Sequence, residues 1–215
     1  SFTIAPWDYY YYAEKVRKAK YDLNEAEIKP YLQLDKLVDG MFWAAGQLYD
    51  MGFRENTGTI PVFDPKVRTF EVYNLKTNEN IGVFYLDNFA REGKRSGAWM
   101  TSFKDQWIDQ KTGENSRPHV TIVMNFTKPT QDKPALLTFD EVETFMHEFG
   151  HALHGMFANT NYESLSGTAV YRDFVELPSQ LMENFSTEKE FLHTFANHYE
   201  TGELIPDELV QRIID

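Results

Sequence analysis

The sequence contains no cysteine among its 215 residues. Disulfide bonds and thiolate metal sites are therefore excluded, so any metal ion must be held by nitrogen and oxygen ligands. That donor set suits a catalytic zinc better than a structural one. A chain without cysteine is compatible with the cytosol and also with the periplasm. We expect a cytoplasmic protein, with the periplasm as the alternative.

Long apolar runs and an excess of basic residues are also absent. No run of about 18 apolar residues occurs, and no basic start leads into an apolar stretch, so the sequence predicts neither a membrane span nor a signal peptide. Its 33 acidic and 21 basic residues give a formal charge of -12. This charge argues against nucleic acid or an anionic membrane as the main partner and leaves short peptides and other small substrates open.

The residues that are present can build a core, since 42% are hydrophobic and 15% aromatic. The chain starts at Ser1 without a methionine and ends inside a helical pattern over Pro206–Asp215. We therefore expect a piece of a longer protein.

The first 52 residues predict two helices. Apolar residues at steps of three and four predict an amphipathic helix over Trp7–Lys29, which Pro30 ends. Its tyrosines, Tyr9–Tyr12, are expected to pack in a core or interface rather than to form a stacking platform. In the second helix we expect Gly52 to be the stop signal. One face of that helix carries Leu37, Met41, Ala44, Leu48 and Met51.

The middle of the chain predicts about four strands, at residues 67–73, 81–86, 97–103 and 119–126. The first two flank a stretch rich in turn formers and predict a hairpin, so an antiparallel or mixed sheet should pack against the helices. The basic stretch Arg91–Gly97 is expected to be a solvated connection rather than an anion-binding loop. His119 is assigned no role, because no second ligand lies at metal spacing from it.

One motif dominates the second half of the sequence. His147 is followed directly by Glu148 and then by His151, which is the H-E-x-x-H pattern of zinc-dependent hydrolases. A helical residue turns by about 100°, so these side chains fall on one face. Thr138 and Glu141 fit a capping box that places the helix start. Apolar residues predict a buried back for this helix: Val142, Phe145, Met146, Phe149, Ala152, Leu153 and Met156.

A hydrolytic zinc site needs three protein ligands and an open position for water. His147 and His151 supply two ligands, and Glu148 is angled aside, where it can act as a general base. A metzincin is disfavoured, because His154 and Phe157 stand where its motif needs glycine and histidine. The third ligand remains open among the downstream glutamates and a disfavoured histidine: Glu163, Glu176, Glu183 and His154.

The rest of the chain predicts a loop over residues 159–170 and three helices. The first helix covers residues 173–185, where Pro178 is tolerated only near the first turn or at a kink. The other two cover residues 191–199 and 206–215.

Two long motifs carry a resemblance to a known family. The first is Phe145-x-His147-Glu148-Phe149-Gly150-His151-x-x-His154, and the second is Ser166-Gly167-Thr168-x-Val170-x-Arg172-Asp173-Phe174-Val175-Glu176-x-Pro178-Ser179-Gln180. Together they resemble the thimet oligopeptidase family of zinc peptidases. Gly93-Lys94-Arg95-Ser96-Gly97-Ala98-Trp99 and Glu14-Lys15-Val16-Arg17 are similar to its peptidyl-dipeptidase (dipeptidyl carboxypeptidase) branch. The resemblance spans nearly the whole chain.

The resemblance implies one Zn²⁺ held by His147, His151 and Glu176, with Glu148 as the general base. It implies hydrolysis of short peptides by release of C-terminal dipeptides, and it implies that residues 93–103 supply an edge strand for the substrate backbone. The alternatives are an endo-acting oligopeptidase of the same family and a non-catalytic fragment that binds peptide or zinc.

Three further residues are candidates for positioning roles. Glu143 lies one helical turn before His147, and Asp173 lies one turn before Glu176, so both could orient ligands through hydrogen bonds or could be surface charges. Ser179 is a weaker candidate of the same kind.

The chain departs from the family pattern in length. Family members are several times longer, with a helical portion before this segment and a tyrosine- and glycine-rich stretch after it that stabilises the tetrahedral intermediate. No stretch of this sequence matches the latter. We expect the metal site to be kept and part of the oxyanion stabilisation, often about 3 to 4 kcal/mol per donor, to come from the remaining parts of the full-length enzyme.

The sequence as a whole predicts an α+β, zincin-like fold that is mostly helical, with a small sheet. We expect one catalytic-core unit over residues 1–215. Residues 1–52 should be helical, residues 60–127 mainly strands, and residues 138–215 helical with the zinc site.

Overall fold

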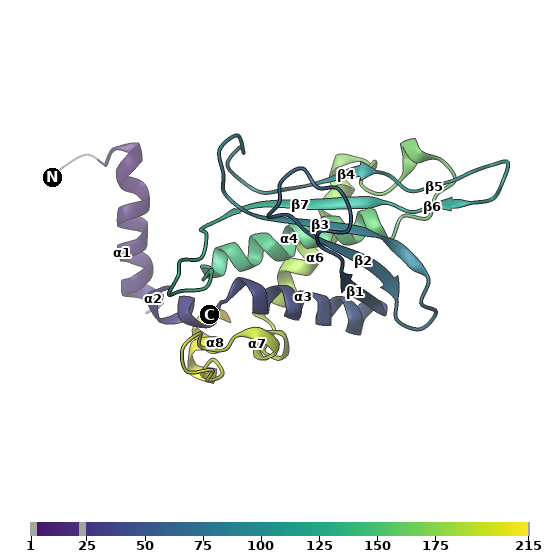
Figure 1. Cartoon of the computed structure of the whole chain (residues 1–215). Helices are drawn as coiled ribbons and strands as arrows, with labels where there is room; N and C mark the ends of the chain where they lie inside the picture. The colour runs from purple at the N-terminus through teal and green to yellow at the C-terminus, as the bar shows by residue number, and fades with distance from the viewer. Residues whose placement is uncertain (1–3, 22–24, 215) are drawn as a thin grey trace.

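The computed structural model describes residues 4–21 and 25–214 and shows an α+β fold (Figure 1). Five strands form one sheet in the order β1-β2-β3-β7-β4, with β3 and β7 parallel and the other neighbours antiparallel. The strands are β1 (Met51–Glu55), β2 (Arg68–Asn74), β3 (Asn80–Phe89), β4 (Trp99–Lys104) and β7 (His119–Phe126). A separate hairpin pairs β5 (Trp107–Ile108) with β6 (Asn115–Ser116). The expected mixed sheet is therefore confirmed.

The predicted hairpin is present as β2 and β3. At its turn the Asn74 side chain accepts hydrogen bonds from the backbone N–H groups of Lys76 and Thr77, both at 2.9 Å, and Asn78 adopts a left-handed backbone with φ 59°. β7 covers the predicted residues 119–126, and most of it is buried, as expected for a strand with a neighbour on each side.

Two long helices cover one face of the sheet, which lies above them in Figure 1. α3 (Leu34–Tyr49) packs against β1, and α4 (Phe139–Met156) packs against β7 and β4. A cluster of aromatic rings joins the layers, with Phe42 stacked on Phe53 at 3.9 Å and Phe84 6.0 Å from Phe149. Burial of such a ring contributes roughly 1.5 to 3 kcal/mol.

Two of the C-terminal helices pack against the long helices. α6 (Leu177–Glu183) packs against α4, and α7 (Lys189–Phe195) packs against α3. The remaining helical segments are η1 (Pro6–Asp8), α1 (Tyr9–Tyr21), α2 (Glu25–Ile28), η2 (Lys29–Tyr31), η3 (Glu163–Leu165), α5 (Arg172–Val175), η4 (Asn184–Thr187) and α8 (Asp207–Ile214). None of the helices in the described ranges combines the length and the apolar character needed to cross a bilayer.

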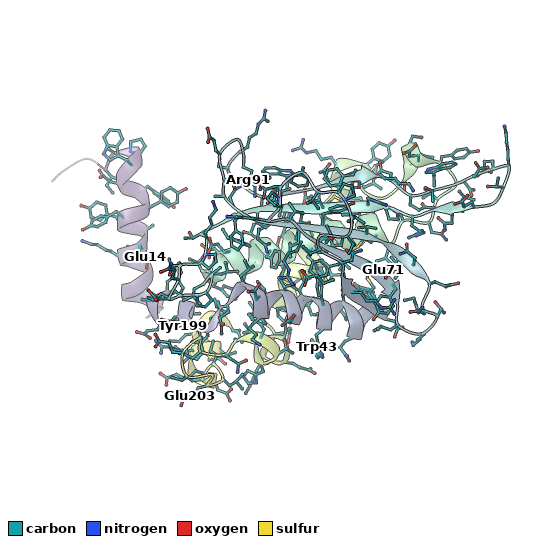
Figure 2. All side chains as sticks on the ribbon, in the orientation of Figure 1. Glu14, Trp43, Glu71, Arg91, Tyr199 and Glu203 are labelled. Carbon is teal, nitrogen blue, oxygen red and sulfur yellow. The ribbon has the colours of Figure 1, made fainter. Side chains whose placement is uncertain are left out.

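The N-terminal helix differs from its prediction. Its expected range contains α1 and α2, and residues 22–24, with Leu23, lie outside the described residues. α1 projects from the rest of the fold (Figures 1 and 2), and Tyr9, Tyr10 and Tyr11 are 64%, 81% and 59% exposed. Packing of Tyr9, Tyr10 and Tyr11 in a core is therefore contradicted, while their packing in an interface stays a prediction.

The end of α3 was also predicted incorrectly. The helix stops at Tyr49 because Asp50 adopts the left-handed conformation (φ 54°), and its backbone N–H bonds to carbonyls of the last turn. Gly52 and Met51 instead belong to β1, a strand that the sequence did not reveal, and Leu48 is exposed rather than buried. Gly52 serves close packing, since a Cβ there would lie 2.4 Å from the Tyr73 ring.

The C-terminal predictions hold with changed boundaries. The helix expected over residues 173–185 is divided among α5, α6 and η4, and Pro178 sits in the first turn of α6, where it is tolerated. The helix expected over 191–199 ends at Phe195. The connection over residues 91–97 was expected to be solvated, but the Lys94 side chain is only 6% exposed.

Candidate metal centre

The predicted motif lies on α4, which begins and packs as its sequence indicates. The Thr138 hydroxyl accepts a hydrogen bond from the Glu141 N–H at 3.2 Å, and the Glu141 carboxylate accepts one from the Thr138 N–H at 2.8 Å, which is a capping box. The seven apolar residues predicted for its back are all buried: Val142, Phe145, Met146, Phe149, Ala152, Leu153 and Met156. His147 and His151 lie outside this apolar back and are only partly buried.

A close helix crossing brings Glu176 to the histidines. Gly150 lies on α4 where α6 crosses, and a Cβ at this position would stand 2.5 Å from the Pro178 carbonyl oxygen and 2.5 Å from the Ser179 Cα. Real Cβ contacts are not this short, so the approach of the two backbones requires glycine. Glu176 is the residue directly before α6 and therefore lies beside α4.

Three potential ligand atoms converge at this crossing. The Glu176 Oε2 lies 3.4 Å from the His147 Nε2 and 3.1 Å from the His151 Nε2. One atom from each of the three residues can be chosen so that all lie within 4.8 Å of one another. Of the four open candidates for a third ligand, Glu176 is the one that joins the two histidines in the described part of the chain.

The arrangement fits a zinc ion. Tetrahedral zinc with bonds of about 2.0 to 2.1 Å separates neighbouring ligand atoms by about 3.3 Å, close to the spacings around Glu176. Burial lowers the pKa of His151, reinforced by His147 and His154 and opposed by Glu176, and this favours the neutral imidazole, which has a lone pair to offer. Two imidazoles and one carboxylate, without thiolate, form a typical catalytic zinc set.

Glu183 holds His147 from the other side of its ring. Its Oε1 lies 2.5 Å from the His147 Nδ1, where an ionised carboxylate can only accept, so Nδ1 carries the proton and Nε2 is free to face Glu176. The sequence offered Glu183 only as a possible third ligand. Glu183 follows Glu176 by about two helical turns, and this spacing in the sequence indicates that the two carboxylates lie on the same side of the helix.

Ser179 supports Glu176. Its side chain is fully buried, and its hydroxyl lies 3.0 Å from the Glu176 Oε2 and 2.9 Å from the Glu176 backbone carbonyl oxygen. A hydroxyl that donates to the carboxylate restricts its rotation and directs its lone pairs. The Glu176 side chain is 48% exposed, so this restraint matters more than it would at a packed position.

Glu148 is buried beside the candidate ligands and next to β4. It is 6% exposed, and burial raises the pKa of its carboxyl, an effect that Glu176 increases and that His147 and a hydrogen bond from the Met100 backbone oppose. A carboxylate with increased proton affinity is suited to take a proton and to return it.

A cleft of about 390 Å³ opens onto these groups. Its lining comes from the start of β4 and the residue before it, from α4, from the loop before α5, and from the end of α5 and the residue after it: Ala98, Trp99, Met100, His147, Glu148, His151, Thr168, Val175 and Glu176. A second hollow shares Ala98, His147 and Glu148 with it and continues past Glu183. The hollow surface therefore continues from Glu148 along the first half of α4.

The other residues singled out from the sequence lie outside the convergent group. His154 is on α4, and its ring packs 6.1 Å from the Phe174 ring. Glu163 lies in η3, and Asp173 is exposed. In the described ranges no hydrogen bond joins Glu143 or Asp173 to the candidate ligands. Glu183 and Ser179 occupy the supporting positions instead.

The family model described as peptidase family M3 matches residues 1–215. The chain belongs to this family. It is 44% identical over 213 residues to the dipeptidyl carboxypeptidase of Escherichia coli (strain K12), covering 99% of this chain and 30% of that protein. The oligopeptidase A of Salmonella typhimurium (strain LT2) is 42% identical over 212 residues, with 98% of this chain and 31% of that protein covered.

A plant relative also matches nearly the whole of this chain with only part of its own length. The organellar oligopeptidase A, chloroplastic/mitochondrial, of Arabidopsis thaliana is 38% identical over 218 residues, covering 100% of this chain and 27% of that protein. The chain thus spans about 30% of the length of the relatives that it matches. The resemblance inferred from the two motifs is confirmed, and the candidate metal centre lies within the matched residues.

Proposed function

We propose that the complete protein is a zinc-dependent peptidase that hydrolyses short peptides and releases dipeptides from their C-terminal ends. The observation that carries this proposal is the convergence of His147, His151 and Glu176 beside the buried Glu148 in one cleft. Relatives named dipeptidyl carboxypeptidase and oligopeptidase A support it.

The proposed roles follow from the geometry. His147, His151 and Glu176 hold the zinc ion, which when bound supplies a Lewis acid and lowers the pKa of water. Glu148 accepts a proton from the attacking water and delivers it to the leaving amine, so one carboxyl group serves both halves of the reaction. The Met100 backbone lies near the Glu148 carboxyl, and both residues line the cleft.

Peptide binding is assigned to β4. This strand pairs with β7 on one side and ends the five-stranded sheet, so its other edge has no strand beside it among the described residues. An extended peptide can add to such an edge through backbone hydrogen bonds, which gives affinity with little dependence on side chains. Because β4 also lines the cleft, a peptide bound there passes Glu148.

The longer enzyme is expected to complete the site. We infer that residues 1–215 form a catalytic-core unit with a zincin-like arrangement around α4, and that the remaining parts of the protein supply further stabilisation of the tetrahedral intermediate. Short peptides and those remaining parts are the proposed partners.

Glu148→Gln tests the catalytic assignment. The complete protein should keep its zinc content while peptide hydrolysis falls by about 100- to 10,000-fold, because the variant cannot take the proton. Glu190→Gln, which changes an exposed glutamate of α7, is the matched surface control and should hydrolyse normally. Unchanged hydrolysis in Glu148→Gln would contradict the mechanism, and a zinc-loaded parent without hydrolysis would favour the alternative of a non-catalytic peptide- or zinc-binding fragment.

Zinc affinity tests the third ligand. Glu176→Ala removes one of three donors, so the affinity should fall sharply in a competition titration with a chelator. Retention of full affinity would direct attention to His154 or Glu163.

A pair of substrates distinguishes the two peptidase reactions. If the enzyme releases C-terminal dipeptides, blocking the C-terminal carboxylate of a peptide as an amide should reduce cleavage at the penultimate position by about tenfold or more, because a charge contact is lost. The alternative is an endo-acting oligopeptidase of the same family. In that case, the free and amidated peptides would be cleaved at the same internal bonds and at similar rates.

A further inference from the structure

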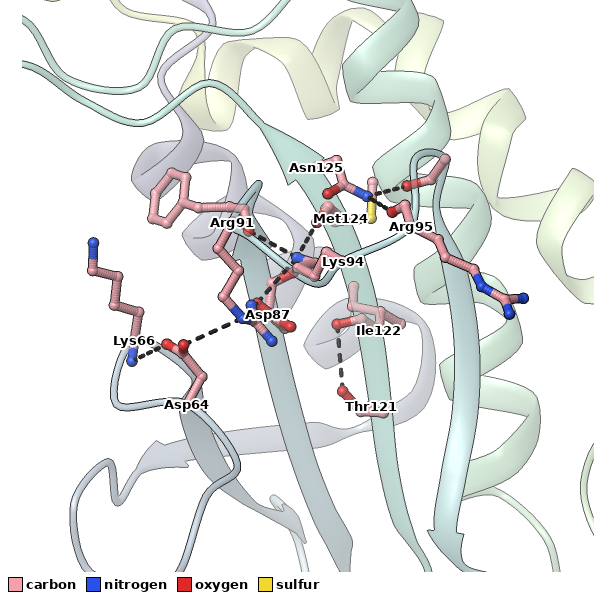
Figure 3. A network of polar contacts seen from close by, with 12 residues as sticks. Asp64, Lys66, Asp87, Arg91, Lys94, Arg95, Thr121, Ile122, Met124 and Asn125 are labelled. Carbon is pink, nitrogen blue, oxygen red and sulfur yellow. Dashed lines mark hydrogen bonds and ion pairs between the residues drawn. The ribbon is translucent and has the colours of Figure 1, made fainter.

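The connection between β3 and β4 contains a buried lysine. Figure 3 shows Lys94 directed inward among the ends of β3 and β7, while the neighbouring Arg95 points outward. The Lys94 side chain is 6% exposed, and the Asp87 side chain beneath it is 4% exposed. Burial of an ammonium group is costly unless its donors are used, so its partners indicate what it does.

Most of the partners of Lys94 are backbone carbonyls. Its Nζ lies 3.2 Å from the Asp87 Oδ1 and 2.8 Å from the Phe89 carbonyl oxygen, and it also donates to the Met124 carbonyl. Phe89 ends β3, and Met124 lies in β7. One side chain thus fixes the connection to two neighbouring strands at once.

A second tether holds the other half of the connection. The Asn125 Nδ2 donates to the carbonyl oxygens of Arg95, at 2.8 Å, and Gly97, at 2.7 Å (Figure 3). Gly93 and Gly97 have φ of 84° and 94°, which lets the backbone turn sharply around Lys94. Residues 93–97 are therefore held against β7 by two sets of hydrogen bonds, one made by Lys94 and one made by Asn125.

Lys94 is not needed to neutralise the charge of Asp87. Arg91 already provides Asp87 with a cation, since its Nη1 lies 2.6 Å from the Asp87 Oδ1, and its Nε lies 3.2 Å from the Asp64 Oδ2. Burial lowers the pKa of Lys94, and Asp87 opposes this effect. Buried ion pairs are weak evidence for stability, and the carbonyl contacts instead point to fixation of the backbone.

The fixed connection leads directly into the cleft. Ala98 follows Gly97 and lines the cleft, Trp99 pairs with Val123 of β7, and Met100 lines the cleft together with Glu148. The path of residues 98–100 therefore determines where the edge that faces a peptide lies relative to Glu148.

We propose that Lys94 is a positioning residue that, together with Asn125, fixes the path of residues 98–100 and so aligns the peptide-binding edge of β4 with Glu148. The proposal rests on the proposed peptidase function. Lys94 itself touches neither the candidate ligands nor the peptide edge, so it acts through the backbone that it holds.

Three variants of the complete zinc-loaded protein test this role. Lys94→Met keeps the length of the side chain and removes the donors, and Asn125→Asp keeps the shape and removes the N–H groups. Arg95→Met is the matched control, because it removes one positive charge from an exposed side chain of the same connection. If Lys94→Met fails to fold, Asn125→Asp still tests whether the hydrogen bonds of Asn125 fix the connection.

Two readouts are needed, amide hydrogen exchange over residues 98–104 and the values of kcat and KM for a short peptide. We expect Lys94→Met and Asn125→Asp to exchange faster in this segment than Arg95→Met, with zinc content retained and kcat/KM reduced by about 10- to 100-fold. A misplaced edge raises KM and a misplaced Glu148 lowers kcat, so both constants should change. A loss of overall stability alone would change neither constant for the folded fraction.

The outcomes are separable. Exchange and kinetics equal to those of Arg95→Met in both tether variants would overturn the positioning role. A parent protein without peptidase activity would refute the proposed function, while the exchange comparison would still decide whether Lys94 and Asn125 fix this segment.

Discussion

The Glu183 carboxylate lies 2.5 Å from the Nδ1 of His147, while the Nε2 of the same ring faces Glu176. The imidazole is therefore held between two carboxylates that come from opposite ends of α6. A histidine oriented in this way presents its lone pair in one direction and is a stronger donor to a metal.

Glu183→Gln tests the orientation of His147. The amide keeps the size of the side chain and loses its charge, so zinc affinity should fall by about 10-fold in a chelator competition, within the range known for residues that support metal ligands. Glu190→Gln, an exposed glutamate of α7, is the control. Equal affinities in the two variants would show that Glu183 does not orient a ligand.

Local patterns predicted the elements that carry the site. The capping residues Thr138 and Glu141 and the periodic apolar back of α4 specify that helix through short-range interactions, and β7 follows from its apolar residues. The two family motifs identified the segment around Glu176. For these parts of the chain, local preference and tertiary structure agree.

The contacts that support the site could not be predicted in the same way. Lys94 stands in a polar, glycine-containing stretch that reads as solvated, and it is buried because Asp87 turns inward at the end of β3. Likewise, Glu183 meets His147 only because α6 crosses α4 at Gly150. The left-handed cap at Asp50 was missed because glycine is the usual residue there.

Gly150→Ala tests the close crossing of α4 and α6. Its Cβ would meet the Pro178 carbonyl oxygen and the Ser179 Cα at 2.5 Å, both backbone atoms that cannot swing aside. We expect a loss of about 1 to 3 kcal/mol in the free energy of unfolding and weaker zinc binding, because Glu176 moves with α6. The measurements are denaturant unfolding and chelator competition.

Gly46→Ala is the matched helix control. A Cβ at Gly46 of α3 would find its nearest neighbours at 3.4 and 3.7 Å, which are ordinary contacts. Alanine is favoured over glycine inside a helix, so this variant should be neutral or slightly stabilised. A Gly150→Ala protein as stable as Gly46→Ala, with unchanged zinc affinity, would exclude the steric argument.

The pair of Glu55 and Arg68 should give a small acid-dependent contribution to stability. Arg68 approaches both carboxylate oxygens, at 3.0 and 2.9 Å, and this hydrogen bonding lowers the pKa of Glu55 from its ordinary value of 4.5. The stabilisation is therefore present above pH 4.5 and is lost as the pH falls through the lower folded-state pKa. Because the Glu55 side chain is 43% exposed, we expect at most about 1 kcal/mol.

Urea unfolding of the parent and Glu55→Gln across a pH series measures this contribution. The difference in the free energy of unfolding should be constant near neutral pH and shrink on acidification below pH 4.5. Glu92→Gln, in the exposed part of the β3–β4 connection, controls for the loss of one charge. A difference that does not change with pH would contradict the ion-pair assignment.

Ser179 and Ser186 form a natural comparison for the support of Glu176. Both side chains are fully buried, and each hydroxyl bonds to the backbone carbonyl three residues earlier, at 2.9 Å for Ser179 and 2.6 Å for Ser186. Of these two hydroxyls, only that of Ser179 also reaches a carboxylate, the Glu176 Oε2 at 3.0 Å.

Replacement of either serine by alanine should destabilise the protein by a similar amount, about 1 kcal/mol for a lost hydrogen bond. Zinc affinity should fall several-fold further in Ser179→Ala than in Ser186→Ala, because the Glu176 carboxylate regains its rotational freedom. If chelator competition gives the same affinity for both, Ser179 serves the helix alone and the direction of Glu176 is set by the metal and the two histidines.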